Sequence, residues 1–168
     1  MSNLTHFNSH GNVHMVDISQ KRDTKRLAFA SGQILMQEKT LNEIKKGTNK
    51  KGDVLGVARI AAIPAAKKTC DLIPLCHLIF ISNMEVYFTI KKNPPSILCE
   101  VQAESTGKTG VEMEALTAVH IGLLTIYDMA KSIDRGMIIS NIRLEKKAGG
   151  KSGKWERSNP KKNTKKLT

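Results

Sequence analysis

The side chains with the greatest capacity for chemistry lie at the two ends of one segment, residues 105–131. A glycine-rich turn, STGKTG, leads into Glu112 and Glu114, and the segment finishes with Asp128 and Lys131. The residues between are mostly apolar, which predicts a long helix buried in a core or at a subunit contact. The free amide N–H groups of the turn at 107–110 and of the first helical turn can bind an anion. The segment therefore predicts an anion-binding helix start, with a charged pair at the far end.

These groups also have structural interpretations. Thr109 and Glu112 fit a capping box, in which each side chain bonds a free amide of the other's residue. Acids in a first helical turn are stabilised by the helix dipole, by about 0.3–1 kcal/mol each. Asp128 and Lys131 are three residues apart and can form a surface pair worth about 0.2–0.5 kcal/mol. Because the pair closes an apolar helix, we expect it to be partly buried, where its pKa values would shift in directions useful for catalysis.

A metal site is not predicted. Cys76 and His77 follow Pro74 in a loop, but no second pair stands at metal-binding spacing. His120 lies in the middle of the apolar segment, so we expect a packed, hydrogen-bonded core histidine rather than a ligand.

Hydrophobic periodicity predicts the elements that position these groups. The predicted order is a strand at 26–36, helices at 40–46 and 53–68, strands at 82–91 and 97–104, the long helix within 105–131, and a last strand at 137–145. Asp53 is a suitable N-cap and Gly47 a suitable helix end. This order predicts an α+β fold, a two-layer ferredoxin-like sandwich with an antiparallel sheet and helices on one face.

Composition limits the class of protein. The 168 residues carry a net charge of +12, but nine Lys/Arg and one Glu from Lys146 onward account for +8 of it. We expect a single domain over 1–153, with an extended arm at 1–20 and a basic, disordered tail at 154–168. Three cysteines, an odd number without C-x-x-C spacing, indicate reduced thiols and a cytoplasmic protein. No apolar run is long enough for a membrane span.

Four ordered motifs resemble one family. They are HMVDIS at 14–19, KGDVLGVARIAAIPAAKKTCDLIPLCH at 51–77, GKTGVEMEALTA at 107–118 with LTIYDMAK at 124–131, and GGKSG at 149–153. The chain resembles cyclic pyranopterin monophosphate synthase, the molybdenum cofactor biosynthesis protein C family, over most of its length. Leu78 stands where that family usually has a proline.

The resemblance implies a reaction and its residues. Members convert a cyclised dihydro-GTP intermediate into cyclic pyranopterin monophosphate and release pyrophosphate, in a lyase reaction. At matching positions, Asp128 is the catalytic residue, with Lys51 and Lys131 as its acid/base partners. The substrate-binding positions are Leu75, Cys76, His77, Glu112, Met113 and Glu114, and Lys21, Arg26 and Lys147 are expected to clamp the triphosphate. No cofactor is implied, and whether magnesium accompanies the triphosphate is left open.

The resemblance also implies partners: a radical S-adenosylmethionine enzyme that supplies the substrate, and homohexamers built as trimers of dimers. Helix geometry supports shared sites independently. Asp128 is 16 and 14 positions from Glu112 and Glu114, which is roughly 21–24 Å of helix axis at about 1.5 Å per residue. One unbroken helix cannot bring both ends to one reacting centre, so we expect sites at a dimer interface.

Two other classes stay open from the residues alone. A basic nucleic-acid-binding module fits the high charge, although aromatic residues are 4% and no base-stacking motif is present. A structural, hexamer-forming protein would also use the apolar helix but would not require Asp128.

Overall fold

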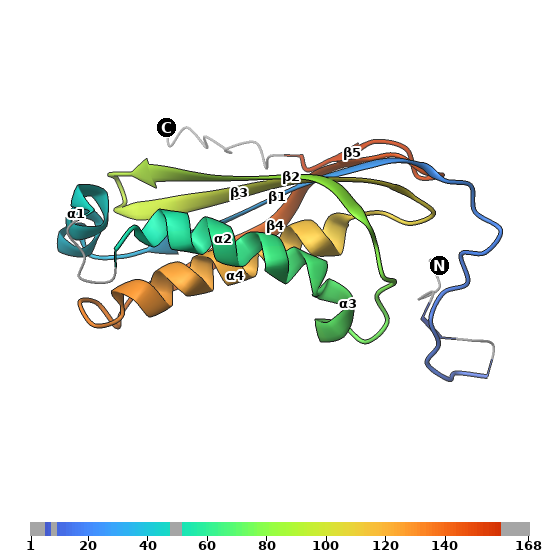
Figure 1. Ribbon diagram of the computed structural model, residues 1–168, viewed down its shortest axis with the longest axis horizontal. Helices are drawn as coiled ribbons and strands as arrows, with labels where there is room; N and C mark the ends of the chain where they lie inside the picture. Colours follow the sequence, from blue (N-terminus) through green and yellow to red (C-terminus); the bar gives the residue numbers. More distant parts are fainter. Residues whose placement is uncertain (1–5, 8–9, 48–51, 159–168) are drawn as a thin grey trace, which may run out of the picture.

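The computed structural model describes residues 6–7, 10–47 and 52–158, which form a two-layer α+β sandwich (Figure 1). One layer is an antiparallel sheet with strand order β2-β3-β1-β4-β5. Its strands are β1 (Thr24–Leu35), β2 (Ile81–Lys91), β3 (Ser96–Gly107), β4 (Ile138–Ala148) and β5 (Trp155–Glu156). The order of the first four is that of the ferredoxin-like sandwich, so the predicted fold class is confirmed.

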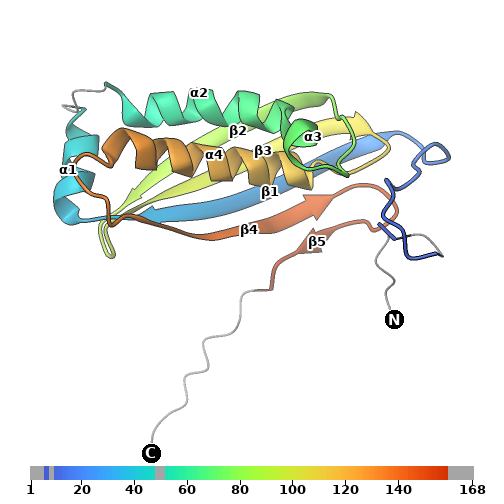
Figure 2. The same cartoon turned by 90° about the horizontal axis from the view of Figure 1, so that it is seen from below.

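Helices cover one face of this sheet. They are α1 (Glu38–Lys46), α2 (Val54–Lys67), α3 (Thr69–Leu72) and α4 (Glu112–Ala130). Figures 1 and 2 show α2 and α4 side by side and antiparallel, so α2 begins at the end of the layer where α4 finishes. The predicted helix signals are confirmed at two positions: the Asp53 carboxylate accepts a bond from the Gly56 N–H, and Gly47 ends α1 in the left-handed conformation.

Small side chains bring the two layers close together. β1 presents Ala28 and Ala30 to the helices, α2 presents Ala58, Ala62 and Ala66, and all five are fully buried. The inward residues of β3 are the predicted set, Ile97, Cys99, Val101 and Ala103, also fully buried. A Cβ at Gly32 of β1 would lie 2.8 Å from the Val119 and Ile142 side chains, so glycine permits α4 to pack against this strand. The alternation in the sequence therefore identifies the core face correctly.

The start of α4 differs from the prediction. The N-cap is Val111, no side chain bonds a free amide there, and the capping box between Thr109 and Glu112 is wrong. Instead the Glu112 carboxylate folds over Gly110, where an added Cβ would lie 1.9 Å from Oε2. The Glu112 side chain therefore lies against the turn that precedes the helix.

The α4 helix is also less enclosed than its composition suggests. Leu124 is half exposed and His120 is exposed, with its Nδ1 bonded to the Leu116 carbonyl 2.8 Å away, so the expectation of a core histidine is wrong. The Asp128–Lys131 pair forms at 2.6 Å, but its side chains are 61% and 51% exposed rather than partly buried. One stripe of α4 therefore faces away from the sheet.

The C-terminal boundary also differs from the prediction. Trp155 and Glu156 form β5, paired with Lys147 and Lys146 of β4, so ordered structure continues past Gly153 into the segment predicted to be disordered. The rest of that segment, 159–168, lies outside the described residues. At the other end, the described part of the arm forms a bridge between Phe7 and Val13.

The β4 strand is irregular along its pairing with β1. Its register shifts twice, between Phe29 and Ala30 and between Ser31 and Gln33 of β1. Asn141 of β4 has a φ of 55°, in the left-handed region. These irregularities bend the strand next to the edge of the sheet.

Candidate active site

Two adjoining hollows lie at the start of α4, where the chain enters the helix from β3. The first has a volume of about 320 Å³ and the second about 350 Å³, and together they offer room for a nucleotide-sized ligand. Lys21, Thr109, Gly110 and Glu112 line both. All nine predicted substrate-binding residues line one or both of them. Leu75, Cys76, His77, Met113 and Glu114 belong to the first hollow, and Arg26 and Lys147 to the second.

The first hollow contains a carboxyl group in an unusual environment. Glu114 is 3% exposed, and its Oε2 has no hydrogen-bond partner among the described residues. Burial, together with the negative charge of Glu112, raises the pKa of Glu114 to about 7. Burial, with the Glu114 carboxylate beside it, also raises the pKa of the Cys76 thiol. This carboxyl can therefore hold or release a proton near neutral pH.

The loop that carries the first hollow's other wall is held in place by the N-terminal arm. α3 ends at Leu72, and the following loop is closed by a bond from the Cys76 N–H to the Ile73 carbonyl, 3.0 Å long. His77 Nε2 lies 2.8 Å from the carbonyl oxygen of Val16, which fixes the imidazole against the arm. Residues far apart in the sequence thus close this hollow around Glu114.

The second hollow is cationic. Five cationic side chains line it: Lys21 from the segment before β1, Arg26 from β1, Lys108 from the turn before α4, Lys147 from the end of β4, and Lys151 from the turn that follows. Lys147 Nζ lies 3.5 Å from Glu112 Oε1, and most of the surface of both side chains is buried. This set can hold several phosphate groups.

The turn after β4 fits closely against Arg26. Arg26 is buried, and its Nε donates to the Gly107 carbonyl at 3.1 Å. Gly149 and Gly150 have φ of 102° and 72°, and a Cβ on them would lie 2.1 Å from the Lys25 carbonyl and 1.7 Å from Arg26 Nη1. The two glycines of the GGKSG motif thus permit the backbone to cover the guanidinium.

The predicted catalytic residues do not join these hollows within one chain. Asp128 and Lys131 lie in the last turn and at the end of α4, whereas Glu112 and Glu114 lie in its first turn. The helix is continuous over 19 residues, so roughly 21 Å of axis separates Glu114 from Asp128. Lys51 lies outside the described residues. The next residues, Gly52 and Asp53, enter α2 at the end of the helical layer where α4 finishes (Figures 1 and 2).

Sequence reasoning missed several residues of the hollows. His6, Val16, Ile18 and Ile79 line the first, and Lys108 and Lys151 line the second. The signal for the two lysines was present, because each stands inside a glycine-rich turn. The other four come from the arm and from the segment before β2, whose positions depend on tertiary structure alone.

The described residues contain no cluster of three or more His, Cys, Asp or Glu side chains arranged to hold a metal ion. None of the helices in the described ranges combines the length and hydrophobicity that a bilayer span requires.

This ferredoxin-like sandwich combines a cationic hollow, which can hold phosphate groups, with a buried carboxyl beside it, an arrangement suited to an enzyme that acts on a phosphorylated small molecule. The family model described as "MoaC family" matches residues 15–150, and the chain belongs to this family. The family is the cyclic pyranopterin monophosphate synthase of molybdenum cofactor biosynthesis. No observation in the described structure favours the nucleic-acid-binding alternative.

Proposed function

We propose that this chain is a pyrophosphate-releasing lyase that converts the cyclised dihydro-GTP intermediate into cyclic pyranopterin monophosphate. The observation that carries the proposal is the junction of the two hollows at Lys21 and Glu112. A nucleoside triphosphate has one strongly anionic end and one polar ring system, and the two hollows differ in the same way. The cationic hollow receives the triphosphate, and the hollow around Glu114 receives the ring system.

The division of labour follows from the residue types. Lys21, Arg26 and Lys147 bind phosphate oxygens and hold the negative charge that develops on the leaving pyrophosphate. A sugar hydroxyl oxygen attacks the α-phosphorus, and the bond from that phosphorus to the oxygen bridging to the β-phosphate breaks. The hydroxyl proton passes to a base. We assign this proton transfer to Asp128 with Lys51 and Lys131, and we assign ring binding to Glu114 and His77 with Leu75, Cys76 and Met113 beside them.

This assignment requires two chains for each site, because α4 holds the two sets of residues at opposite ends. The helical layer presents a suitable surface for a second copy. Ile60 on α2 is 73% exposed and Leu124 on α4 is 52% exposed, with the half-exposed Val57 also on α2. Two antiparallel copies of α4 would bury these apolar side chains and place one chain's Asp128 near the other chain's Glu114. The exposure of Asp128 and Lys131 in the single chain supports this arrangement.

Further features follow from the family resemblance and belong to the same proposal. Three such dimers assemble into a hexamer. A radical S-adenosylmethionine enzyme supplies the substrate, and the protein works in the cytoplasm.

The direct test is incubation of the protein with the cyclised GTP intermediate while pyrophosphate release is measured. Stoichiometric pyrophosphate and cyclic pyranopterin monophosphate are expected. If the intermediate is bound and remains unchanged, the proposed reaction is wrong.

The shared site is tested by mixing two inactive variants, Glu114→Ala and Asp128→Ala, under conditions in which subunits exchange. A mixed dimer holds one intact site and one site with both defects, so activity should return. Exchange is verified by mass spectrometry of the mixed dimer. Verified exchange without recovered activity would show that each site is built from one chain.

A further inference from the structure

A short strap follows β4 and returns to pair with it. The turn at 149–153 reverses the chain, with a bond from the Gly153 N–H to the Gly150 carbonyl of 3.1 Å. β5 then pairs Trp155 with Lys147 and Glu156 with Lys146. One residue later, the Arg157 N–H donates to the Glu145 carbonyl at 2.8 Å. Figures 1 and 2 show this strap lying along the outer edge of β4.

The strap forms one wall of the cationic hollow. Gly149, Lys151 and Ser152 line the hollow together with Lys147. Lys147 Nζ donates a short hydrogen bond to Ser152 Oγ, in addition to its ion pair with Glu112. The position of the Lys147 ammonium group therefore depends on where the turn lies.

Apart from its packing against Arg26 and the Lys147–Ser152 bond, the turn depends on the short strand that follows it. Gly149, Gly150 and Gly153 all have positive φ, and glycine-rich backbone loses much conformational entropy when it is ordered. The β4–β5 ladder is only two residue pairs long. Trp155 is the β5 residue paired with Lys147, and the two line a hollow with Leu27 and Ala148.

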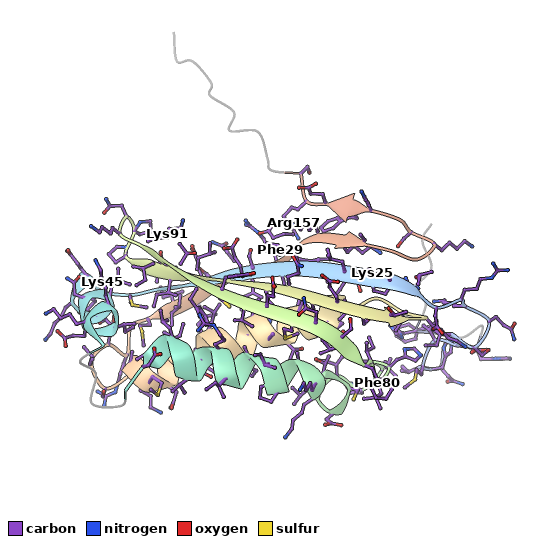
Figure 3. All side chains as sticks on the ribbon, turned by 45° about the horizontal axis from the view of Figure 1, so that its top comes forward. Lys25, Phe29, Lys45, Phe80, Lys91 and Arg157 are labelled. Carbon is purple, nitrogen blue, oxygen red and sulfur yellow. The ribbon has the colours of Figure 1, made fainter. Side chains whose placement is uncertain are left out.

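Arg157 contacts the indole ring of Trp155. Its guanidinium carbon lies 5.6 Å from the centre of the Trp155 ring, within the range of a cation–π contact. Arg157 Nε also donates to the Leu144 carbonyl at 2.9 Å. Figure 3 shows Arg157 with Phe29 on the side of the sheet away from α2 and α4. Trp155 is thus paired with a β4 lysine and contacts an arginine that is itself bonded to β4, although 41% of its surface remains exposed.

We propose that Trp155 is a positioning residue for the triphosphate end of the substrate: it fastens the strap to β4 and so sets Lys147 and the turn that carries Lys151. The inference rests on the proposed function, since it assumes that the cationic hollow binds phosphate groups. Without the indole, the turn and the Lys147 side chain must be ordered at the moment of binding, and that entropy is lost from affinity. Removal of the indole should therefore weaken binding of the phosphate groups and leave the rate of the later proton transfers unchanged.

The test uses the full-length protein and inorganic triphosphate as the probe, with dissociation constants measured by calorimetry. Trp155→Ala is expected to raise the Kd for inorganic triphosphate about tenfold. Its KM for the cyclised GTP intermediate should rise by a similar factor, with kcat within about twofold of the original value. Trp155→Phe, which retains a ring for the Arg157 guanidinium to contact, should restore most of the affinity.

The matched control is Tyr87→Ala, which removes another half-exposed aromatic side chain, from the strand at the opposite edge of the sheet. It should leave the Kd unchanged. If Trp155→Ala does not fold, Trp155→Val removes the ring while retaining high strand propensity, and the same measurements decide.

A Kd unchanged in the ring-free variants would overturn the proposal. So would a fall in kcat with KM and Kd unchanged, which is the result of a smaller folded fraction. Binding of inorganic triphosphate requires no turnover, so it can be measured even if the protein has no synthase activity. If the Kd then still rises in Trp155→Ala, the proposed function is refuted but the role of Trp155 is not.

Discussion

Glu114→Gln provides a quantitative test of the buried carboxyl. Burial raises the pKa of Glu114 from 4.5 to about 7, and each pKa unit corresponds to about 1.4 kcal/mol. Charging this group therefore costs the folded state about 3 kcal/mol relative to the unfolded chain. The folded state binds the proton more tightly, so this contribution to stability is complete below about pH 4.5. It is lost as the pH rises to about 7.

Glutamine has nearly the same shape and carries no charge at any pH. Relative to the original protein, the free energy of unfolding of Glu114→Gln should therefore rise between about pH 4.5 and 8, by up to ~3 kcal/mol. If the amide fits the hollow less well than the carboxyl group, the difference in free energy of unfolding shifts by the same amount at every pH. Its dependence on pH is then unchanged. The pH dependence of the difference, rather than its value at one pH, is the diagnostic quantity.

The assay is urea unfolding at a series of pH values, without substrate and at one protein concentration for all samples. Titrating groups that do not interact with Glu114 affect both proteins equally and cancel in the difference. Glu38→Gln, in the exposed first turn of α1, controls for the loss of one carboxylate. A difference between Glu114→Gln and the original protein that stays constant from pH 5 to 8 would refute the reasoning.

Three further predictions concern catalysis and stability. Asp128→Ala and Lys51→Ala should each abolish pyrophosphate release while the melting curve stays cooperative; an active Asp128→Ala protein would contradict the assignment. Asp53→Ala removes the acceptor for a first-turn N–H of α2 and should lower the free energy of unfolding by about 1 kcal/mol in urea titrations. Gly32→Ala should cost about 1–3 kcal/mol in the same assay, because its Cβ meets the Val119 side chain at 2.8 Å; an unchanged midpoint would show that α4 can move away.

Local signals in the sequence predicted most of the fold. The alternation Ala28, Ala30, Ile34 identifies the core face of β1 because a strand repeats every two residues. Asp53 and Gly47 identify helix ends because a cap depends on one residue and its nearest backbone. Such features need no knowledge of what lies across the molecule.

The errors arise where tertiary structure decides. Thr109 and Glu112 match a capping box in sequence, but Glu112 folds over Gly110 and lies near Lys147 of β4 instead. His120 lies among apolar neighbours in the sequence, yet a helix turns about 100° per residue, and this position faces away from the sheet. β5 was missed because its two residues carry too little periodicity to be recognised as a strand.

Most of the residues grouped at the start of α4 could be named only through the family motifs. Lys21, Leu75 and Lys147 come from three separate parts of the chain, and no local pattern relates them. The raised pKa of Glu114 could not be read from the sequence either. An acid in a first helical turn is ordinarily solvated, and its burial here depends on the loop around Cys76.

The bends in β4 have a consequence for the behaviour of the protein at high concentration. Strands at the edges of a sheet expose unpaired backbone groups, and a long flat edge invites other chains to add to it. The register shifts opposite Phe29 and Ser31 and the left-handed Asn141 keep β4 from being flat, and β5 covers part of it. At the other edge, Arg59 of α2 donates to the Val86 carbonyl of β2. Both edges of the sheet thus carry features that disfavour edge-to-edge association. The helical layer is therefore the more favourable surface for self-assembly.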